Sequence, residues 1–483
     1  MKILKNRDCS AFVLYAVLIV VLLSSMVAVS LLYATKSAET ASSAGEEGEQ
    51  AWAVALSGVY KAIQVAQAAQ AGLAEWQNNP NEFKEQLVAE DGQDKWYFTV
   101  YDWSGSEDSE GAIIYGLTDE ARKLNLKYLP ETLKERSEES ELLAALKNKL
   151  PLEGVDSFAL SFPEVEADES GSVFENQREN PREQDSSKPE LVPLTGSSSP
   201  PEFEFLDAFI AQQGYNLKTL YGKDLDMNLR SDSGTEDVGD IFQEGVGAGP
   251  LGMGLRHYLT TVSYDLNQDS LGEARLNLNN TNSELATLGL STETLSYIEA
   301  MQRNNRRIES LASLLSSSET LRDEDGNERE YRIELSGDEL EKVFDMCTTI
   351  DEVYLPALIN INTAPKEVLM VLPELEESEI EAIISSREGL LGDQLKTPVW
   401  LLEQGILSRE KFQAIYPYIT TRSWQYHFHV IGYSFPSGRY RVLEVLVDVA
   451  GQSPQILMMR DLTRLGMPFK IDNEVNGINA AAS

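Results

Sequence analysis

An acidic loop in the middle of the chain carries the residues best suited to holding a cation. Its oxygen donors are Asp224, Asp226, Asn228, Asp232 and Glu236. Donors at this mostly alternate spacing can converge on calcium if the backbone curls round the ion. Leu229 stands at the sixth position, where an EF-hand requires glycine. The spacing therefore predicts an irregular calcium site of modest affinity that orders the surrounding domain, with a merely solvated acidic loop as the alternative.

Two other patterns have the form of ligand sites but lack part of the context that such sites need. His427 and His429 lie two apart on a predicted strand and share a face, yet no third metal ligand is evident in the sequence. Gly247, Gly249 and Gly252 fit G-x-G-x-x-G, but no strand precedes them and a strand-like segment follows. The sequence favours an aromatic-rich strand surface over a metal site for the first, and argues against dinucleotide binding by the second.

No catalytic constellation is evident. The sequence contains no G-x-S-x-G, Walker A, C-x-x-C or H-E-x-x-H motif, and no other nucleophile stands beside a base. Three histidines argue against a His-rich metalloenzyme. We therefore expect a protein without catalysis of its own; a hydrolase in the middle region is the third interpretation, for which no residues are found.

Residues 362–388 have the outline of a helix-hairpin-helix. In the DNA-binding form of this motif, glycine N–H groups in the hairpin meet a phosphate beside basic residues. Here the hairpin, Pro373–Glu377, has no glycine and three acids. The chain has 78 acidic and 40 basic residues, a formal net charge of -38, which repels phosphate backbones. The sequence therefore favours a protein-packing module and no nucleic-acid partner.

An uncharged segment near the N-terminus, Ala11–Ala34, is long enough to cross a bilayer. Basic residues precede it, which predicts a cytoplasmic N-terminus and places the rest of the chain on the far side. The helical pattern continues through Trp52–Ala66 and is expected to end near Asn78–Pro80. A cleaved signal peptide is the alternative. Because Cys9 and Cys347 then lie on opposite sides, no disulfide forms within one chain.

Further elements are predicted from periodicity, caps and breakers. The expected strands are Lys95–Asp102, Ala112–Tyr115, Tyr426–Phe435, Tyr440–Val449 and Gln455–Leu462. The expected helices are Asp119–Asn125, Pro130–Leu150, Phe203–Ile210, one capped by Asn362, one with a Ser378–Glu381 capping box, Pro398–Gln404 and Arg409–Ile415. Pro163–Pro201, rich in Glu, Asp, Ser and Pro, is expected to be disordered.

Three short stretches resemble one another: Leu124–Leu126, Leu276–Asn279 and Ile359–Asn362. Each is an alternating apolar–Asn segment followed by a predicted helix start. The pattern predicts either a degenerate repeat or convergence on one local solution, in which the asparagine caps a helix.

Several segments, in order along the chain, resemble the minor pseudopilin K family of type II secretion systems. They are Asp119–Leu126 (DEARKLNL), Asn360–Pro373 (NINTAPKEVLMVLP), Thr397–Leu402 (TPVWLL), Tyr418–Ser423 (YITTRS), Val430–Tyr433 (VIGY) and Met459–Gly466 (MRDLTRLG). The resemblance covers both ends and much of the middle, without Pro163–Pro201.

The resemblance implies a pseudopilin anchored in the inner membrane that starts or caps a periplasmic filament with the I-type and J-type minor pseudopilins and the major pseudopilin. It also implies contact with the secretin or secreted cargo, calcium binding, and cleavage by prepilin peptidase, here between Cys9 and Ser10. The family lacks the usual glutamate at the fifth mature position, which is Leu14 in this sequence.

The expected fold class is α+β: a single-pass transmembrane helix continuing into an amphipathic helix, a pseudopilin-like antiparallel sheet, and an inserted, mostly helical domain with a helix-hairpin-helix-like (SAM-like) module. The expected ranges are a leader (1–10), the transmembrane helix (11–34), the pseudopilin helix and first strands (35–118), the start of the inserted region (119–162), the disordered insertion (163–201), the inserted helical domain (202–340), the hairpin module (341–423) and the C-terminal strands (424–483). The alternative function is a membrane-anchored helix-hairpin-helix protein for DNA uptake.

Overall fold

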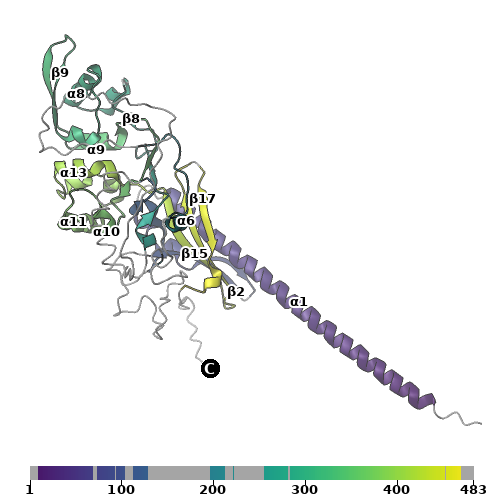
Figure 1. Ribbon diagram of the computed structural model, residues 1–483. Coiled ribbons are helices and arrows are strands. Elements are labelled where there is room, and N and C mark those ends of the chain that lie inside the picture. The colour runs from purple at the N-terminus through teal and green to yellow at the C-terminus, as the bar shows by residue number, and fades with distance from the viewer. Residues whose placement is uncertain are drawn as a thin grey trace, which may run out of the picture.

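A single long helix dominates the molecule. The computed structural model describes residues 9–68, 73–92, 94–103, 113–128, 196–212, 221, 255–280, 283–451 and 453–468. Helix α1 (Cys9–Ala68) runs out of the folded body as one rod (Figure 1). Its side chains from Leu14 to Tyr33 are exposed, and all but three serines are apolar. Leu14–Glu39 is long and apolar enough to cross a membrane, and no other described helix passes that test.

The other half of α1 packs on an antiparallel sheet with the strand order β1-β2-β15-β16-β17. These strands are Gln86–Asp91, Asp94–Trp103, Gln425–Phe435, Tyr440–Asp448 and Gln455–Asp461. Two short strands, β3 (Ile113–Ile114) and β4 (Thr118–Asp119), extend it by pairing with β2 and β15. The N-terminal and C-terminal parts of the chain thus form one sheet, and everything between Asp119 and Gln425 is inserted into it.

Small residues let α1 lie close to the sheet. Ala51, Ala55 and Ala62 are fully buried against apolar side chains of β2, β15 and β16. At Gly432 of β15, an added Cβ would lie 2.5 Å from the backbone nitrogen of Ala55 and 2.6 Å from the carbonyl oxygen of Ala51. Only glycine therefore fits between this strand and the helix backbone.

Gly432→Ala is accordingly expected to destabilise the chain by about 1–3 kcal/mol, because the helix backbone has to move away from the strand. Gly45→Ala is the matched control, since Gly45 lies in the same helix with nothing within 4 Å of an added Cβ. It is expected to stabilise by up to about 1 kcal/mol through helix propensity. Gly432 lies in β15 and Gly45 lies in α1, the helix that Gly432 faces. Thermal unfolding of the full chain in detergent measures both variants; equal effects would contradict the close approach.

The inserted region combines short helices with short strands. Its described α-helices are α6 (Leu206–Gln212), α8 (Thr292–Arg303), α9 (Asp338–Met346), α10 (Lys366–Leu369), α11 (Glu377–Arg387), α12 (Trp400–Glu403) and α13 (Arg409–Ile415). Its described strands are β5 (Leu124–Asn125), β6 (Leu259–Thr260), β7 (Tyr264–Leu266), β8 (Leu276–Asn277), β9 (Ser317–Arg322), β10 (Glu328–Ile333), β11 (Cys347–Thr348), β12 (Tyr354–Pro356), β13 (Ile359–Asn360) and β14 (Ile419–Thr420). A second apolar core joins these helices.

Three loops of this region are closed by the same local structure, which we call a clasp. In each clasp an apolar–Asn pair runs parallel to an apolar–Thr or Cys–Thr pair: β5 with β6, β8 with β11, and β13 with β14. The residue after the asparagine donates its N–H to the threonine carbonyl, at 2.9, 2.9 and 3.1 Å for Leu126→Thr260, Leu278→Thr348 and Ile361→Thr420.

The side chains repeat as well. Each first asparagine accepts a hydrogen bond from the N–H two residues later: Lys127, Asn279 and Asn362 for Asn125, Asn277 and Asn360. Its amide group donates to the residue three after the threonine: Ser263, Asp351 and Ser423. A further threonine follows the threonine of each clasp strand, and its hydroxyl donates to a backbone carbonyl inside the loop that the clasp closes: Thr261 to Glu204, Thr349 to Glu309 and Thr421 to Lys396. The three sequence stretches therefore share one structure.

The predicted role of these asparagines was wrong, since they cap turns and not helices. Asn362 likewise donates to the carbonyls of Leu395 and Thr421, and α10 begins later, at Lys366. The predicted helix Asp119–Asn125 was also wrong. Its backbone forms β4, a 3-10 turn (η2, Glu120–Arg122) and β5, because Leu124 donates its N–H to Tyr258 across a clasp.

The helical segment that begins with α1 ends close to Asn78, as predicted: α1 is described to Ala68, residues 69–72 lie outside the described residues, and a short helix, α2 (Leu73–Trp76), follows before α3 (Pro80–Phe83). Other boundaries differ from expectation. The capping box of α11 is formed by Glu376 and Glu379, since the helix begins at Glu377. The end of the predicted disordered segment is ordered: Ser197 exchanges backbone hydrogen bonds of 2.7 and 2.9 Å with Tyr354. Residues 163–195 and 130–150 lie outside the described residues.

The C-terminal strands and α13 are confirmed within one residue. The apolar helix candidate, the antiparallel sheet and the mixture of helix and sheet are also confirmed. Two paired strands in the inserted region, β9 and β10, were not predicted; their polar sequences SSETLR and EREYRI lack the apolar alternation of a half-buried strand.

Candidate functional site

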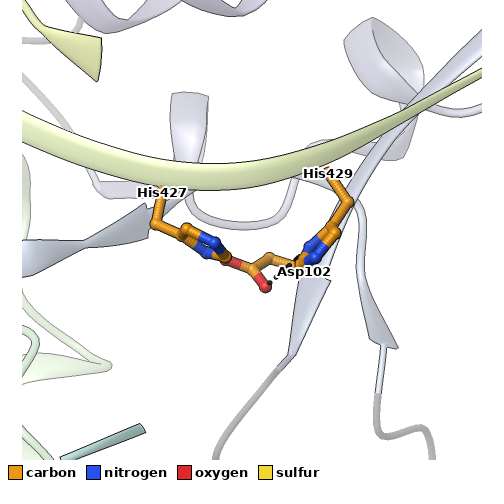
Figure 2. Close-up of side chains that lie close together, drawn as sticks. All are labelled: Asp102, His427 and His429. Carbon is orange, nitrogen blue, oxygen red and sulfur yellow. Dashed lines mark hydrogen bonds and ion pairs between the residues drawn. The ribbon is translucent and has the colours of Figure 1, made fainter. Parts of the chain in front are cut away.

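A buried cluster of charged side chains lies where β2 separates from β15. The register of these two strands ends at the pair Tyr101–His429, and β4 takes the place of β2 opposite His427. Asp102, the next residue of β2, lies between the two histidines. Figure 2 shows both imidazole rings beside its carboxylate. The sequence had placed the two histidines on one face; the structure adds the acid that joins them.

The distances within this group are short. His427 Nδ1 lies 2.9 Å from Asp102 Oδ2, and His429 Nδ1 lies 3.4 Å from Asp102 Oδ1. One potential ligand atom from each of the three side chains lies within 4.8 Å of the other two. All three residues are buried. The geometry can therefore hold either a shared proton or a small cation.

A second carboxylate approaches His427 from the other side. Glu444 of β16 lies with its Oε1 3.1 Å from His427 Nε2 and 2.5 Å from Arg256 Nη2. Its Oε2 lies 3.4 Å from Nε of Arg460 on β17. Arg256 belongs to a short helix, η4 (Leu255–His257), of the inserted region. The cluster thus joins four strands of the sheet (β2, β15, β16 and β17) to the insertion.

These neighbours change the acidity of the cluster. Burial alone lowers the pKa of His427, but the carboxylates of Asp102 and Glu444 outweigh it and raise that pKa to about 9. Burial opposes ionisation of both acids, yet His427 and, for Glu444, also Arg256 hold their pKa values well below the usual range. Burial lowers the pKa of His429. At neutral pH, without a bound cation, His427 is an imidazolium between two carboxylates.

His429 differs from His427 in its hydrogen bonding. Its ring stacks on Tyr101, with the ring centroids 5.3 Å apart. Its Nδ1 atom is buried and makes no hydrogen bond of good geometry, although it lies beside Asp102. A buried nitrogen of this kind is costly unless a partner satisfies it. Within the cluster, His429 Nδ1 and Glu444 Oε2 are the two buried atoms without a hydrogen bond, although each lies 3.4 Å from an oppositely charged partner.

A half-open cavity of about 70 Å³ adjoins the cluster. His427, Glu444, Arg256 and Arg460 contribute to its wall, along with residues of η2, β6 and the segment before α6. Arg460 also contacts Asp207 of α6, with Nη2 3.1 Å from Oδ2. Solvent thus has a route to within one side chain of the Asp102 carboxylate.

A second buried acid, Asp119, lies at the root of the insertion. Its Oδ1 accepts from the N–H of Ala121, and its Oδ2 accepts from Asn360 Nδ2 at 2.9 Å and from Thr363 Oγ1 at 2.7 Å. It therefore connects β4 of the sheet to the third clasp. Burial outweighs these hydrogen bonds and raises the pKa of Asp119 from 3.8 to about 6.

This raised pKa predicts a pH-dependent contribution to stability. Between pH about 4 and 6 the folded chain keeps a proton on Asp119 that the unfolded chain has released. The wild type should therefore gain stability relative to Asp119→Ala as the pH falls through 6, by at most about 1.4 kcal/mol per pH unit. Urea unfolding of both chains from pH 7.5 to 4.5 measures this difference. A difference that is constant over this range would contradict the raised pKa.

Only some of the site residues predicted from the sequence lie in the part of the chain that the structure describes. The calcium loop (Asp224, Asp226, Asn228, Asp232 and Glu236) and the Gly247–Gly252 motif lie outside the described residues. Cys9 and Ser10 begin α1, and the leader before them is outside the described residues. Among the predicted ligand-site patterns, the histidine pair lies within the described residues, and the structure brings it together with Asp102 and Glu444.

Comparison with known proteins adds no assignment. No protein-family model matches the chain, and no curated protein is significantly similar to it.

Proposed function

We propose that the chain is a minor pseudopilin of a type II secretion system. It is anchored in the inner membrane by α1 and starts or caps the periplasmic pseudopilus together with the I-type, J-type and major pseudopilins. It has no catalysis of its own; it helps to export folded proteins through the secretin. Prepilin peptidase removes its leader between Cys9 and Ser10, and the acidic loop Asp224–Glu236 binds calcium.

The observation that carries this proposal is the division of α1 into two halves. The first half exposes an uncharged, mostly apolar surface, and the second half packs through alanine and glycine against an antiparallel sheet. A helix of this kind can hold a folded body at a fixed distance from a bilayer and leaves its apolar half for lipid or for neighbouring helices. The segments that resemble the pseudopilin K family, in the same order along the chain, support the specific proposal of a minor pseudopilin.

The hairpin between α10 and α11 supports packing between proteins more than contact with DNA. Lys366 is paired with Glu377 and Glu381, at 2.6 and 3.1 Å. Glu374 takes the left-handed backbone conformation, with φ of 60°, at a hairpin position where a DNA-binding motif would use glycine. The hairpin therefore presents carboxylates where a phosphate would have to bind.

Deleting the gene and restoring it tests the proposal. Deletion is expected to leave type II cargo in the periplasm, and the intact gene restores its export. The matched variant carries arginine at Val20 and Leu23, inside the exposed apolar half of α1, and should fail to restore export because charged residues are costly in the bilayer. Normal export in the deletion strain, together with lost DNA uptake, would favour the alternative function.

The same alternative is tested directly with DNA. The full chain in detergent, including Leu358–Ile419, is expected not to bind duplex DNA, because like-charge repulsion grows as salt is lowered. Fluorescence anisotropy of a labelled random duplex at low salt measures this. Micromolar binding that weakens with added salt would contradict the prediction.

A further inference from the structure

We propose that Asp102, His427 and His429 form a binding site for one transition-metal ion, for which Zn²⁺ is the best match. This inference is independent of the proposed function, and it concerns a different site from the acidic loop predicted to bind calcium. It rests on the geometry of three buried side chains from two strands, β2 and β15.

The donor set selects the class of metal. Two imidazole nitrogens and one carboxylate oxygen suit Zn²⁺ and its neighbours, whereas calcium and magnesium require oxygen ligands. Tetrahedral Zn²⁺ with bonds of about 2.1 Å keeps its ligand atoms about 3.4 Å apart. The His429 Nδ1–Asp102 Oδ1 distance is 3.4 Å, and all three potential ligand atoms lie within 4.8 Å of one another. Only small side-chain shifts are needed to place an ion among them.

A carboxylate outside the three ligands already orients one of them. His427 Nε2 lies 3.1 Å from Glu444 Oε1. If Nε2 carries the proton and donates it to Glu444, the lone pair of Nδ1 faces Asp102, where the ion would lie. In zinc sites a histidine ligand usually donates its other N–H to a carboxylate that does not touch the metal, and this hydrogen bond fixes the tautomer of the ligand.

The hydrogen bonding of His429 also favours a bound ion. Its Nδ1 is buried, faces the Asp102 carboxylate and has no hydrogen bond of good geometry. An ion between these two atoms would satisfy both. The cavity beside His427 and Glu444 brings solvent to one of the three ligands, His427.

The rival occupant is a proton. In the metal-free chain a proton on His427 Nδ1 faces Asp102 and a second proton on Nε2 faces Glu444, and Arg256 and Arg460 balance the remaining charge of Glu444. Zn²⁺ has to displace the Nδ1 proton, which is released to solvent, while the Nε2 proton stays on the ring. No other covalent change occurs.

Metal titration of the full chain in detergent, after treatment with chelator, tests the site. We expect one Zn²⁺ per chain with micromolar or tighter affinity, and a rise in melting temperature of several degrees that chelator reverses. Cobalt(II) in place of zinc should give the intense visible absorption of a tetrahedral site. Excess calcium should not displace either ion.

His429→Phe is the decisive variant, since it keeps the ring on Tyr101 and removes both nitrogens. It should lose zinc binding and the cobalt absorption. His257→Gln is the matched control, because it removes the remaining histidine of the chain, which is not part of the three-residue group, and should bind one zinc as the wild type does. Absence of micromolar zinc binding in the wild type, or unchanged binding in His429→Phe, would overturn the proposal, whether or not the variant folds well.

Discussion

Glu444→Gln is expected to destabilise the chain by about 3–5 kcal/mol, the usual cost of removing one partner from a buried ion pair. Glu444 is buried between Arg256, Arg460 and His427, and glutamine has nearly the same shape. The substitution leaves the guanidinium of Arg256, 2.5 Å from Glu444 in the wild type, without its closest counter-charge. Breaking this contact should also loosen η4, and with it the insertion, from the sheet.

The matched control is Glu330→Gln on the exposed strand β10. Glu330 pairs with Arg332 at 2.8 Å, a contact as short as many in the buried cluster but open to solvent. Solvent screens exposed pairs, so this variant should unfold close to the wild type. Thermal and urea unfolding in detergent measure both chains. If the two variants lose the same stability, burial does not strengthen the ion pairs of Glu444, and the cluster does not hold the insertion to the sheet.

The histidine pair shows how far sequence reasoning reaches. Alternation along residues 426–435 predicted the strand and the shared face of His427 and His429, because both are local properties with a period of two. Asp102 lies 325 residues from His427 in the chain, at the point where β2 leaves the register of β15. No local sequence pattern shows where β2 stops pairing with β15. The third side chain of the group therefore required the fold.

The clasps are encoded by two repeated sequence patterns, of which the sequence analysis identified one. The apolar–Asn stretches were recognised as similar, but their partners were not. Those partners, Leu259–Thr261, Cys347–Thr349 and Ile419–Thr421, each end in Thr-Thr, and each has serine or aspartate three residues after the first threonine. Each partner lies downstream of its apolar–Asn stretch, so a search for a second repeated pattern after each stretch would find all three. In the structure each asparagine side chain accepts a hydrogen bond from the N–H two residues later, which closes a turn and does not cap a helix.

Each clasp asparagine is expected to stabilise the chain far more than an exposed asparagine with the same acceptor. Asn277 and Asn280 provide this comparison, since both donate to Asp351 Oδ1 at 2.8 Å. Asn277 is buried and also accepts from the N–H of Asn279, whereas Asn280 is exposed. Asn277→Ala should cost about 1–3 kcal/mol because it leaves a buried N–H unsatisfied, and Asn280→Ala less than about 0.5 kcal/mol.

Asn360→Ala should have the largest effect among the three clasps, about 2–4 kcal/mol. Asn360 is fully buried, and its amide group donates both to Ser423 and to the carboxylate of Asp119, and hydrogen bonds to charged groups contribute about 1.5–3 kcal/mol each. It joins the third clasp to β4, so its loss affects both the insertion and the sheet. Urea unfolding of the variants in detergent gives the order. If Asn360→Ala unfolds like Asn280→Ala, the clasps are incidental turns and the insertion is held by its apolar core alone.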